Sequence, residues 1–340
     1  MNLYKTQDRP YPKFIANGKK NEYFTNVIKT FMGRDALRVF LYNTKPNKVL
    51  IPAYICQEVI NEFLRSNCEI HYYDINPDFS IDCKKIADTI NSKGIDLYYY
   101  LVYFGIANNN NNISKKIKEN CPKVIIVEDR AHYLSNKYDL INCDAYIFSF
   151  RKLLPITEGG GIYTNIPLEI NFSGKLQSNI LPILMYLKKK ILGYNDKYNR
   201  TSLTNGKFHH SVMPISKHSQ NVIDRYDYNS EVEFRKDCYI QWVEALKGSN
   251  IKPVFETIED DDIPQGCPIY VNNSERAQEY LSQKKYYLRR HWKLDEGMLK
   301  VAPVSYSISN KIITLPIYIG INKKIQNNII KLLVDIKRIS

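Results

Sequence analysis

The sequence predicts an α/β protein, with a mostly parallel sheet flanked by helices and a smaller α+β domain at the C-terminal end. Through the first half of the chain, short apolar runs alternate with segments of helical periodicity, as in parallel sheets with helices on both faces. Beyond residue 250 the pattern changes to short strands mixed with helices. The length of 340 residues suits one large domain and one smaller domain.

The elements of the first half follow one another at regular spacing. Strands are expected where apolar residues run without interruption, and helices where they recur every three or four positions. The predicted strands are 49–52, 69–74, 97–105, 123–127, 144–149 and 161–164. The predicted helices are 25–43, interrupted by Gly33, and 55–66, 82–92 and 113–120. Five consecutive asparagines, 108–112, are expected to form a loop.

The chain is expected to divide into an irregular N-terminal arm (1–24), a large domain (25–245) and a small domain (246–340). The large domain includes a variable helical segment at about 170–245, with a long helix predicted over 224–246. The apolar stretch 180–192 suits an amphipathic helix packed on the protein or on a partner subunit, or else a helix on a membrane surface. In the small domain, strands are predicted at 268–271 and 312–316, and helices at 274–283 and 323–337.

The net charge of +13 raises the question of an anionic partner. The basic residues are spread along the chain, and small groups such as 188–190, 289–291 and 323–324 do not form a long basic tract. We therefore expect no nucleic-acid partner; a solvated basic surface or a phosphate-bearing small molecule explains the surplus.

The seven cysteines are scattered and show no C-x-x-C spacing. That pattern argues against a disulfide framework and against a metal site. With no signal-like N-terminus and no run long enough to span a bilayer, we expect a cytoplasmic protein without integral membrane association.

An apolar run, 124–127, leads directly into Glu128, Asp129 and Arg130, with His132 close behind. Ligands of open parallel sheets bind at the carboxyl ends of the strands. A buried carboxylate there needs a partner, and the protonated ring nitrogen of a cofactor is one candidate. An ion pair between Asp129 and Arg130 is the alternative.

A second apolar run ends at Ser149, followed by Arg151 and Lys152 and then by the glycines 159–161. A lysine amine can form a Schiff base with a carbonyl if its pKa is lowered, and a neighbouring arginine favours that. The glycines allow the backbone to approach a ligand closely. A surface Arg-Lys pair with an ordinary glycine turn is the alternative.

A third segment, 31–38, places Gly33, Arg34 and Asp35 at a helix start. Free backbone N–H groups at a helix start bind phosphate, and an arginine fork suits phosphate oxygens. A helix break with a solvated arginine is the alternative.

Taken in order, these segments resemble the DegT/DnrJ/EryC1/StrS family of pyridoxal-phosphate enzymes, which are best known as sugar aminotransferases. Further similar segments are 49–54, 103–105, 268–271, 290–292 and 315–317, so the resemblance covers about residues 25–337. It implies a fold-type-I transferase, pyridoxal 5'-phosphate as cofactor, and a homodimer. Lys152 comes only three residues after Ser149, a shorter spacing than the commoner family pattern, which indicates a divergent subgroup.

The resemblance also implies the roles of single residues. Lys152 would hold the cofactor covalently and move protons, and Asp129 would pair with the pyridine nitrogen. Ser149 would hold the phosphate together with backbone groups near Gly33, Arg34 and Asp35. His132 would lie near the phenolic oxygen, and Tyr54 would stack on the ring. Arg290 and His291 are candidate substrate contacts.

The resemblance implies transfer of an amino group from glutamate to a nucleotide-linked keto sugar, in glycan or surface-polysaccharide biosynthesis. Some members of the family lack the lysine and act as dehydratases, so Lys152 favours transamination. A dehydratase or another pyridoxal-phosphate reaction on the same scaffold remains the alternative, and a basic binding protein without catalytic activity is a more distant one.

Overall fold

The computed structural model describes residues 20–107, 112–172, 211–318 and 321–339. Most of the predicted N-terminal arm, four of the five asparagines of the predicted loop and the predicted helix 180–192 lie outside these residues. Among the described residues, no helix has both the length and the apolar composition needed to cross a membrane.

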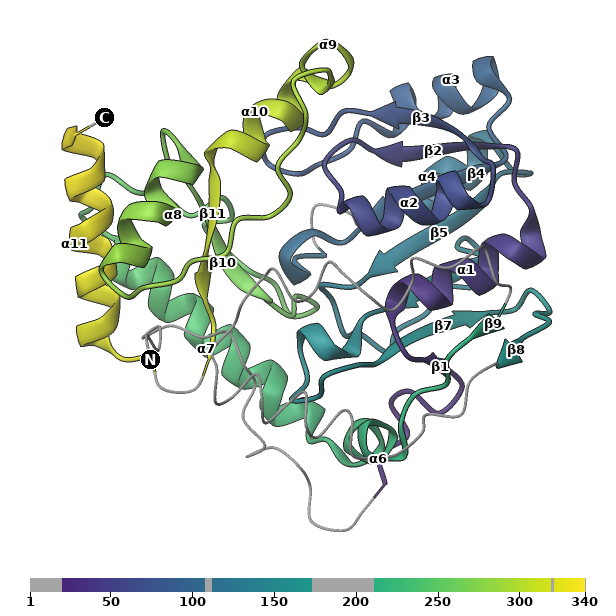
Figure 1. Ribbon diagram of the computed structural model, residues 1–340, viewed down its shortest axis with the longest axis horizontal. Helices are drawn as coiled ribbons and strands as arrows, with labels where there is room; N and C mark the ends of the chain where they lie inside the picture. Colours follow the sequence, from purple (N-terminus) through teal and green to yellow (C-terminus); the bar gives the residue numbers. More distant parts are fainter. Residues whose placement is uncertain (1–19, 108–111, 173–210, 319–320, 340) are drawn as a thin grey trace.

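A seven-stranded sheet forms the centre of the molecule (Figure 1). Its strands stand in the order β1-β7-β6-β5-β4-β2-β3. β7 runs antiparallel to both of its neighbours, and the other adjacent pairs are parallel. The strands are β1 (Ile28–Thr30), β2 (Lys48–Pro52), β3 (Glu69–Tyr73), β4 (Leu97–Leu101), β5 (Ile125–Arg130), β6 (Ala145–Phe148) and β7 (Gly160–Thr164).

Helices cover the sheet and bury a separate apolar core against each face. The helices of this part are α1 (Gly33–Thr44), α2 (Gln57–Arg65), α3 (Cys83–Lys93) and α4 (Ile113–Asn120). Side chains alternate along β4, so Leu97 and Tyr99 join the core beneath α1 and α2 while Tyr98 and Tyr100 join the core that contains α3 and α4. The mostly parallel sheet with helices on both faces is therefore confirmed.

The C-terminal part combines a two-stranded antiparallel ribbon with helices at one side of the sheet (Figure 1). The ribbon pairs β10 (Gly266–Tyr270) with β11 (Ile312–Pro316). The helices here are α8 (Ser274–Gln283), α9 (Met298–Val301), α10 (Pro303–Lys311) and α11 (Lys323–Ile339). A short pair, β8 (Asn171–Phe172) with β9 (Ser211–Val212), lies at the edge of the large part.

The long helix predicted over 224–246 is α7 (Tyr228–Leu246), and a separate helix, α6 (Lys217–Arg225), precedes it. Tyr226 has an extended backbone, and the Asp227 carboxylate accepts a hydrogen bond from the backbone N–H of Ser230, so it caps α7. The indole N–H of Trp242 in α7 donates to the carbonyl of Pro316 at 2.8 Å, which ties α7 to the ribbon.

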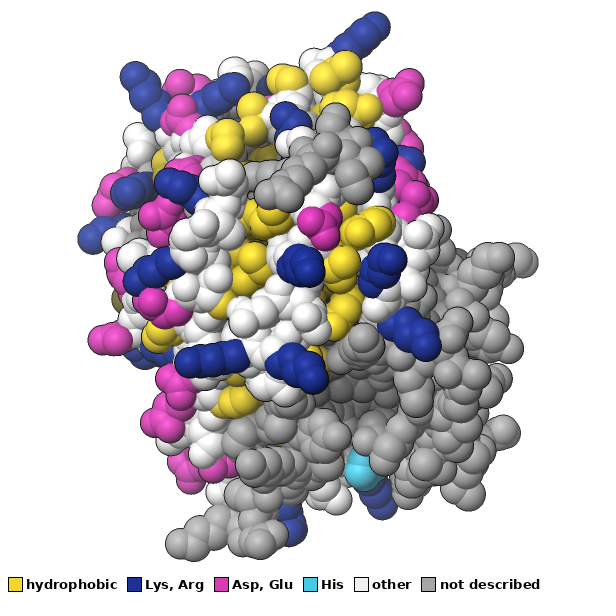
Figure 2. Space-filling model, turned by 90° about the vertical axis from the view of Figure 1, so that its left-hand side faces the viewer, with side chains coloured by type: hydrophobic (Ala, Val, Ile, Leu, Met, Phe, Trp, Pro, Cys, Tyr) yellow, Lys and Arg dark blue, Asp and Glu magenta, His cyan; other side chains and the backbone are white. Residues whose placement is uncertain are grey.

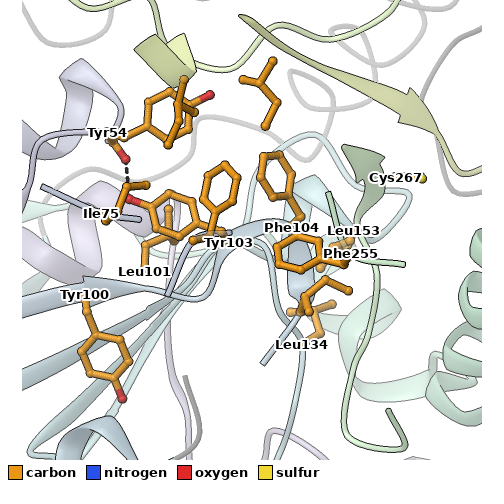
Figure 3. Close-up of a cluster of buried hydrophobic side chains, with 14 of the residues drawn as sticks. Tyr54, Ile75, Tyr100, Leu101, Tyr103, Phe104, Leu134, Leu153, Phe255 and Cys267 are labelled. Carbon is orange, nitrogen blue, oxygen red and sulfur yellow. Dashed lines mark hydrogen bonds between the residues drawn. The ribbon is translucent and has the colours of Figure 1, made fainter. Parts of the chain in front are cut away.

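The turn after β4 joins the sheet to the C-terminal part. The predicted strand 97–105 ends at Leu101, and a 3-10 turn, η2 (Tyr103–Gly105), follows it. The backbone N–H of Ile263 donates to Gly105 O at 2.8 Å. A Cβ on Gly105, at φ +75°, would lie 2.0 Å from Ile263 O, so this contact requires glycine. Figure 3 shows Tyr103 and Phe104 of this turn beside Tyr54 and Phe255. The precise domain boundaries stay a prediction.

Candidate functional site

Asp129 lies near the carboxyl end of β5, which extends further than predicted and includes all of 125–130. Its side chain is buried, and its carboxylate accepts hydrogen bonds from Tyr99 Oη and from the backbone N–H of Ala131, both at 2.7 Å. Burial raises the pKa of Asp129, whereas the charge of Lys152 and these two hydrogen bonds act in the opposite direction. Asp129 is thus a fixed buried carboxylate that a cation would stabilise.

Lys152 ends a 3-10 turn, η4 (Phe150–Lys152), directly after β6, the strand that pairs with β5. Its backbone N–H donates to Ser149 O at 3.1 Å, so the turn fixes the distance between the serine and the lysine along the chain. Burial lowers the pKa of Lys152, and Cys56 and Asp129 partly offset this change. Two adjacent parallel strands therefore deliver a carboxylate and an amine, each of which burial shifts towards its neutral form.

The start of α1 lies against this turn. A Cβ on Gly33 would stand 2.8 Å from Phe148 O and 3.5 Å from Ser149 Cβ. Ser149 is buried, and the Arg34 Nε is buried without a hydrogen-bond partner. Gly33 and Ser149 are thus neighbours at the start of α1, where the helix presents its positive end; the phosphate-binding role expected of them and of Arg34 stays a prediction.

Asp35 is already engaged within its own helix. Its backbone N–H donates to Met32 O at 3.0 Å, and its carboxylate accepts from the Met32 N–H at 3.0 Å. The carboxylate also lies 3.3 Å from Arg38 Nη1. Asp35 therefore caps the start of α1. These contacts do not support the contribution to an anion site that was predicted for it.

The glycines 159–161 serve the chain itself rather than leaving room for a ligand. A Cβ on Gly160 would stand 2.1 Å from the carbonyl carbon of Met32, and one on Gly161 would stand 2.6 Å from Val27 Cγ1. Gly159, at φ +131°, donates its N–H to Phe31 O at 2.7 Å. These contacts hold the start of α1 against the turn that carries the lysine.

His132 lies at the same edge of the sheet and is almost completely buried. Its Nδ1 accepts a hydrogen bond from the backbone N–H of Phe104 at 3.4 Å, which leaves Nε2 to carry the ring proton. The ring stacks on Trp292 with centroids 5.5 Å apart and planes 14° apart. Burial lowers the pKa of His132 well below its ordinary value, and Lys152 lowers it further.

Tyr54 is fully buried among other rings and leaves little room for a cofactor ring to stack on it. It stacks on Tyr103 at 5.9 Å, meets Trp292 edge-on at 5.1 Å, and donates from its hydroxyl to His291 O at 3.3 Å. Cys56, two residues further on, is the side chain whose pKa responds to both Lys152 and Asp129, after the larger effect of burial. These electrostatic effects indicate that Cys56 is near the lysine and the carboxylate, whereas Tyr54 is enclosed by other rings.

Glu128 and Arg130 point to the other face of β5 from Asp129, because side chains alternate along a strand. Arg130 Nε lies 2.6 Å from Glu128 Oε1, and its guanidinium lies 4.1 Å from the centre of the Tyr146 ring. The alternative in which Asp129 forms its ion pair with Arg130 is therefore wrong. Arg130 also donates to Ser135 O and Lys137 O, so it holds the loop that carries His132.

The segment 289–292 of the C-terminal part reaches the same edge of the sheet. His291 lies 5.2 Å from His132 between ring centres, whereas Arg290 Nη1 lies 3.7 Å from Glu275. Arg289, which belongs to the basic group 289–291, contributes to lowering the pKa values of Lys152, His132 and His291.

Sequence motifs did not indicate Arg289, Tyr99 or Cys56 as site residues. For Tyr99 the sequence held a partial signal, because it lies in the apolar run 97–105, and the structure pairs this strand with the one that carries Asp129.

Comparison with known proteins gives one clear result, which concerns the fold. No protein-family model matches the chain, and no curated protein matches it in sequence. Among solved structures, a DegT DnrJ EryC1 StrS aminotransferase from Brucella abortus matches with a TM-score of 0.64 and 17% identity, over 91% of this chain and 85% of that one.

The apo form of a sugar aminotransferase from Streptococcus pneumoniae matches with a TM-score of 0.70 and 14% identity, over 99% of this chain and 98% of that one. The sugar aminotransferase CalS13 from Micromonospora echinospora matches with a TM-score of 0.64 and 12% identity, over 98% of this chain and all (100%) of that one. These likenesses show that the chain has the fold-type-I architecture of these aminotransferases. They confirm the predicted resemblance at the level of the fold.

Proposed function

We propose that this chain is a pyridoxal-phosphate-dependent aminotransferase whose substrate is a keto sugar. The observation that carries the proposal is that Asp129 and Lys152 come from the carboxyl ends of two adjacent parallel strands, and that burial raises the pKa of the carboxyl and lowers that of the amine. Perturbed groups of this kind cluster at functional sites. The fold shared with sugar aminotransferases supports the same assignment.

The residues present fit pyridoxal 5'-phosphate. The buried Arg34 Nε lacks a partner, and Arg34 follows Gly33, which lies against Ser149 at the positive end of α1, where a phosphate could be bound. Asp129 offers a buried carboxylate for a protonated ring nitrogen. When bound, the cofactor supplies an electron sink for chemistry at the carbon next to the transferred nitrogen.

The protein's own groups hold and move protons around that centre. Lys152 has a lowered pKa, so its Nζ gives up a proton more readily than an exposed lysine and is suited to act as a base. Tyr99 and the N–H of Ala131 fix the Asp129 carboxylate, and they favour its charged form. His132, with Nδ1 held by Phe104, presents Nε2–H as a hydrogen-bond donor in a fixed orientation.

The substrate assignment rests on charge and on the likeness to sugar aminotransferases. Arg289 contributes to lowering the pKa values of Lys152, His132 and His291, so its positive charge acts on the site. Such a site suits anionic substrates, and we propose glutamate as amino donor and a nucleotide-linked keto sugar as acceptor. Glycan or surface-polysaccharide biosynthesis is the corresponding setting, and a cytoplasmic homodimer is the corresponding form. On the face formed by the C-terminal helices, the described basic side chains are interspersed with acidic and apolar ones (Figure 2).

The test uses purified protein incubated with pyridoxal 5'-phosphate. We expect a visible absorption band at about 400–430 nm. Addition of glutamate should change this band and release 2-oxoglutarate. K152A should abolish both responses, whereas K137A, which alters an exposed lysine paired with Asp261, should retain them. A wild-type protein that binds the cofactor but releases no 2-oxoglutarate would rule out glutamate transamination and favour the dehydratase alternative.

A further inference from the structure

His291 is a buried imidazole with one unsatisfied nitrogen. Only 5% of the residue is exposed, and its Nε2 is buried without a hydrogen-bond partner. A buried polar atom left unpaired costs about 1–3 kcal/mol. An apolar ring would fill the same space without that cost, so the nitrogen calls for a functional explanation.

The His291 ring is fixed by its neighbours. It meets Phe104 edge-on at 5.1 Å, His132 at 5.2 Å and Trp292 at 5.5 Å, measured between ring centres. Its backbone carbonyl accepts the Tyr54 hydroxyl at 3.3 Å. A ring held in this way cannot turn far to find a protein partner, and it lies beside the histidine that borders the proposed cofactor site.

The chemistry of the ring restricts what it can recognise. Burial lowers the pKa of His291 well below its ordinary value, and Arg289 and Lys152 lower it further. The ring is therefore neutral near pH 7 and can donate or accept one hydrogen bond at Nε2, depending on its tautomer. A carboxylate is better bound by the nearby cations, whereas a hydroxyl group, which both donates and accepts, matches a neutral imidazole.

We propose that His291 is a specificity-determining residue that forms a hydrogen bond with a hydroxyl group of the carbohydrate amino acceptor. This inference rests on the proposed function and adds that different groups of the protein bind the two substrates. The amino donor depends on the cations around Lys152, and the acceptor depends on His291. Loss of the nitrogen should therefore affect the second half of the reaction and leave the first half largely intact.

The experiment compares H291F, which keeps a ring of similar shape, with H291N, which restores a polar group. H218F is the matched control, because it makes the same change at an exposed histidine of α6. The donor reaction is followed with glutamate as the change in the visible absorption band. The acceptor reaction is followed with a panel of nucleotide-linked keto sugars that differ in the position of the keto group, and their binding to each variant is measured by calorimetry.

We expect H291F to retain the absorption band and a donor reaction within about twofold of wild type, while kcat/KM for the acceptor falls roughly tenfold and its Kd rises to a similar extent. H291N should recover part of this loss, and H218F should behave as wild type. Equal losses in both half-reactions of H291F, or acceptor binding within about twofold of wild type, would overturn the proposal.

The same experiment separates this inference from the proposed function. A wild-type protein without an absorption band or a donor reaction would refute the proposed function itself. A wild-type protein that reacts with glutamate but binds none of the keto sugars would overturn the role of His291, while leaving the cofactor assignment in place.

Discussion

Removing the Tyr99 hydroxyl should make the stability of the protein depend more strongly on pH. Tyr99 donates to the buried carboxylate of Asp129 at 2.7 Å. Hydrogen bonds to charged groups contribute about 1.5–3 kcal/mol, and 1.36 kcal/mol corresponds to one pH unit in a pKa, so Y99F should raise the pKa of Asp129 by about one to two pH units. The pKa of Asp129 is already raised by burial, and Y99F raises it further.

The sign of the effect follows from proton linkage. A carboxyl group whose pKa is higher in the folded state than in the unfolded state binds more protons when folded. Its contribution to stability is complete below the unfolded pKa and is lost as the pH rises through the folded pKa. Y99F should therefore lose more stability relative to wild type at pH 8 than at pH 5, reaching about 2 kcal/mol at the higher pH.

The assay is urea denaturation of the cofactor-free protein at both pH values. Y73F is the control, because the Tyr73 hydroxyl donates to the neutral backbone carbonyl of Tyr99 at 3.3 Å in the same sheet. That variant should lose about 1 kcal/mol at either pH. If Y99F loses the same free energy of unfolding at pH 5 and pH 8, the Asp129 carboxylate does not depend on Tyr99 and the reasoning fails.

Two further predictions concern the scaffold, and both are measured by urea denaturation at pH 7. G160A should destabilise the protein by about 2 kcal/mol or more, because the new Cβ would stand 2.1 Å from the Met32 carbonyl carbon. G297A, where nothing lies within 4 Å, should change stability by less than about 0.5 kcal/mol, and an equal loss in both variants would contradict the close approach. E62Q should cost about 3 kcal/mol, because the buried Glu62 carboxylate pairs with Arg38 at 2.8 Å. E244Q, which alters an exposed pair, should change stability by less than about 1 kcal/mol, and a similar value for E62Q would refute the importance of the buried pair.

The sheet could be predicted from the sequence because its strands are continuous apolar runs, and such runs are typical of strands buried on both faces. The ends of the strands were harder to predict. β5 continues through Glu128, Asp129 and Arg130 because each of these polar groups finds a partner: Glu128 with Tyr100, Asp129 with Tyr99, and Arg130 with Glu128. Strand periodicity alone carries no information about such pairs.

The contribution of the C-terminal part to the site could not be predicted from local patterns. His291 reaches His132 only because the turn after β4 hydrogen-bonds to residues 263–265, a contact between segments about 160 residues apart. The sequence also did not separate two roles for Asp35, because a position at a helix start suits a cap as well as an anion site. The sequence also did not show whether Tyr54 or Cys56 lies nearer the site. The structure shows that Tyr54 is buried among other rings.

Chemical mapping of the lysine that carries the cofactor is the most direct test of the central claim. The protein is saturated with pyridoxal 5'-phosphate and reduced with borohydride, and the modified peptides are identified by mass spectrometry. The account predicts about one label per chain, on the peptide that contains Lys152, with no label at that position in K152R. A label distributed over exposed lysines, with Lys152 unmodified, would contradict the claim that Lys152 and Asp129 form the cofactor site.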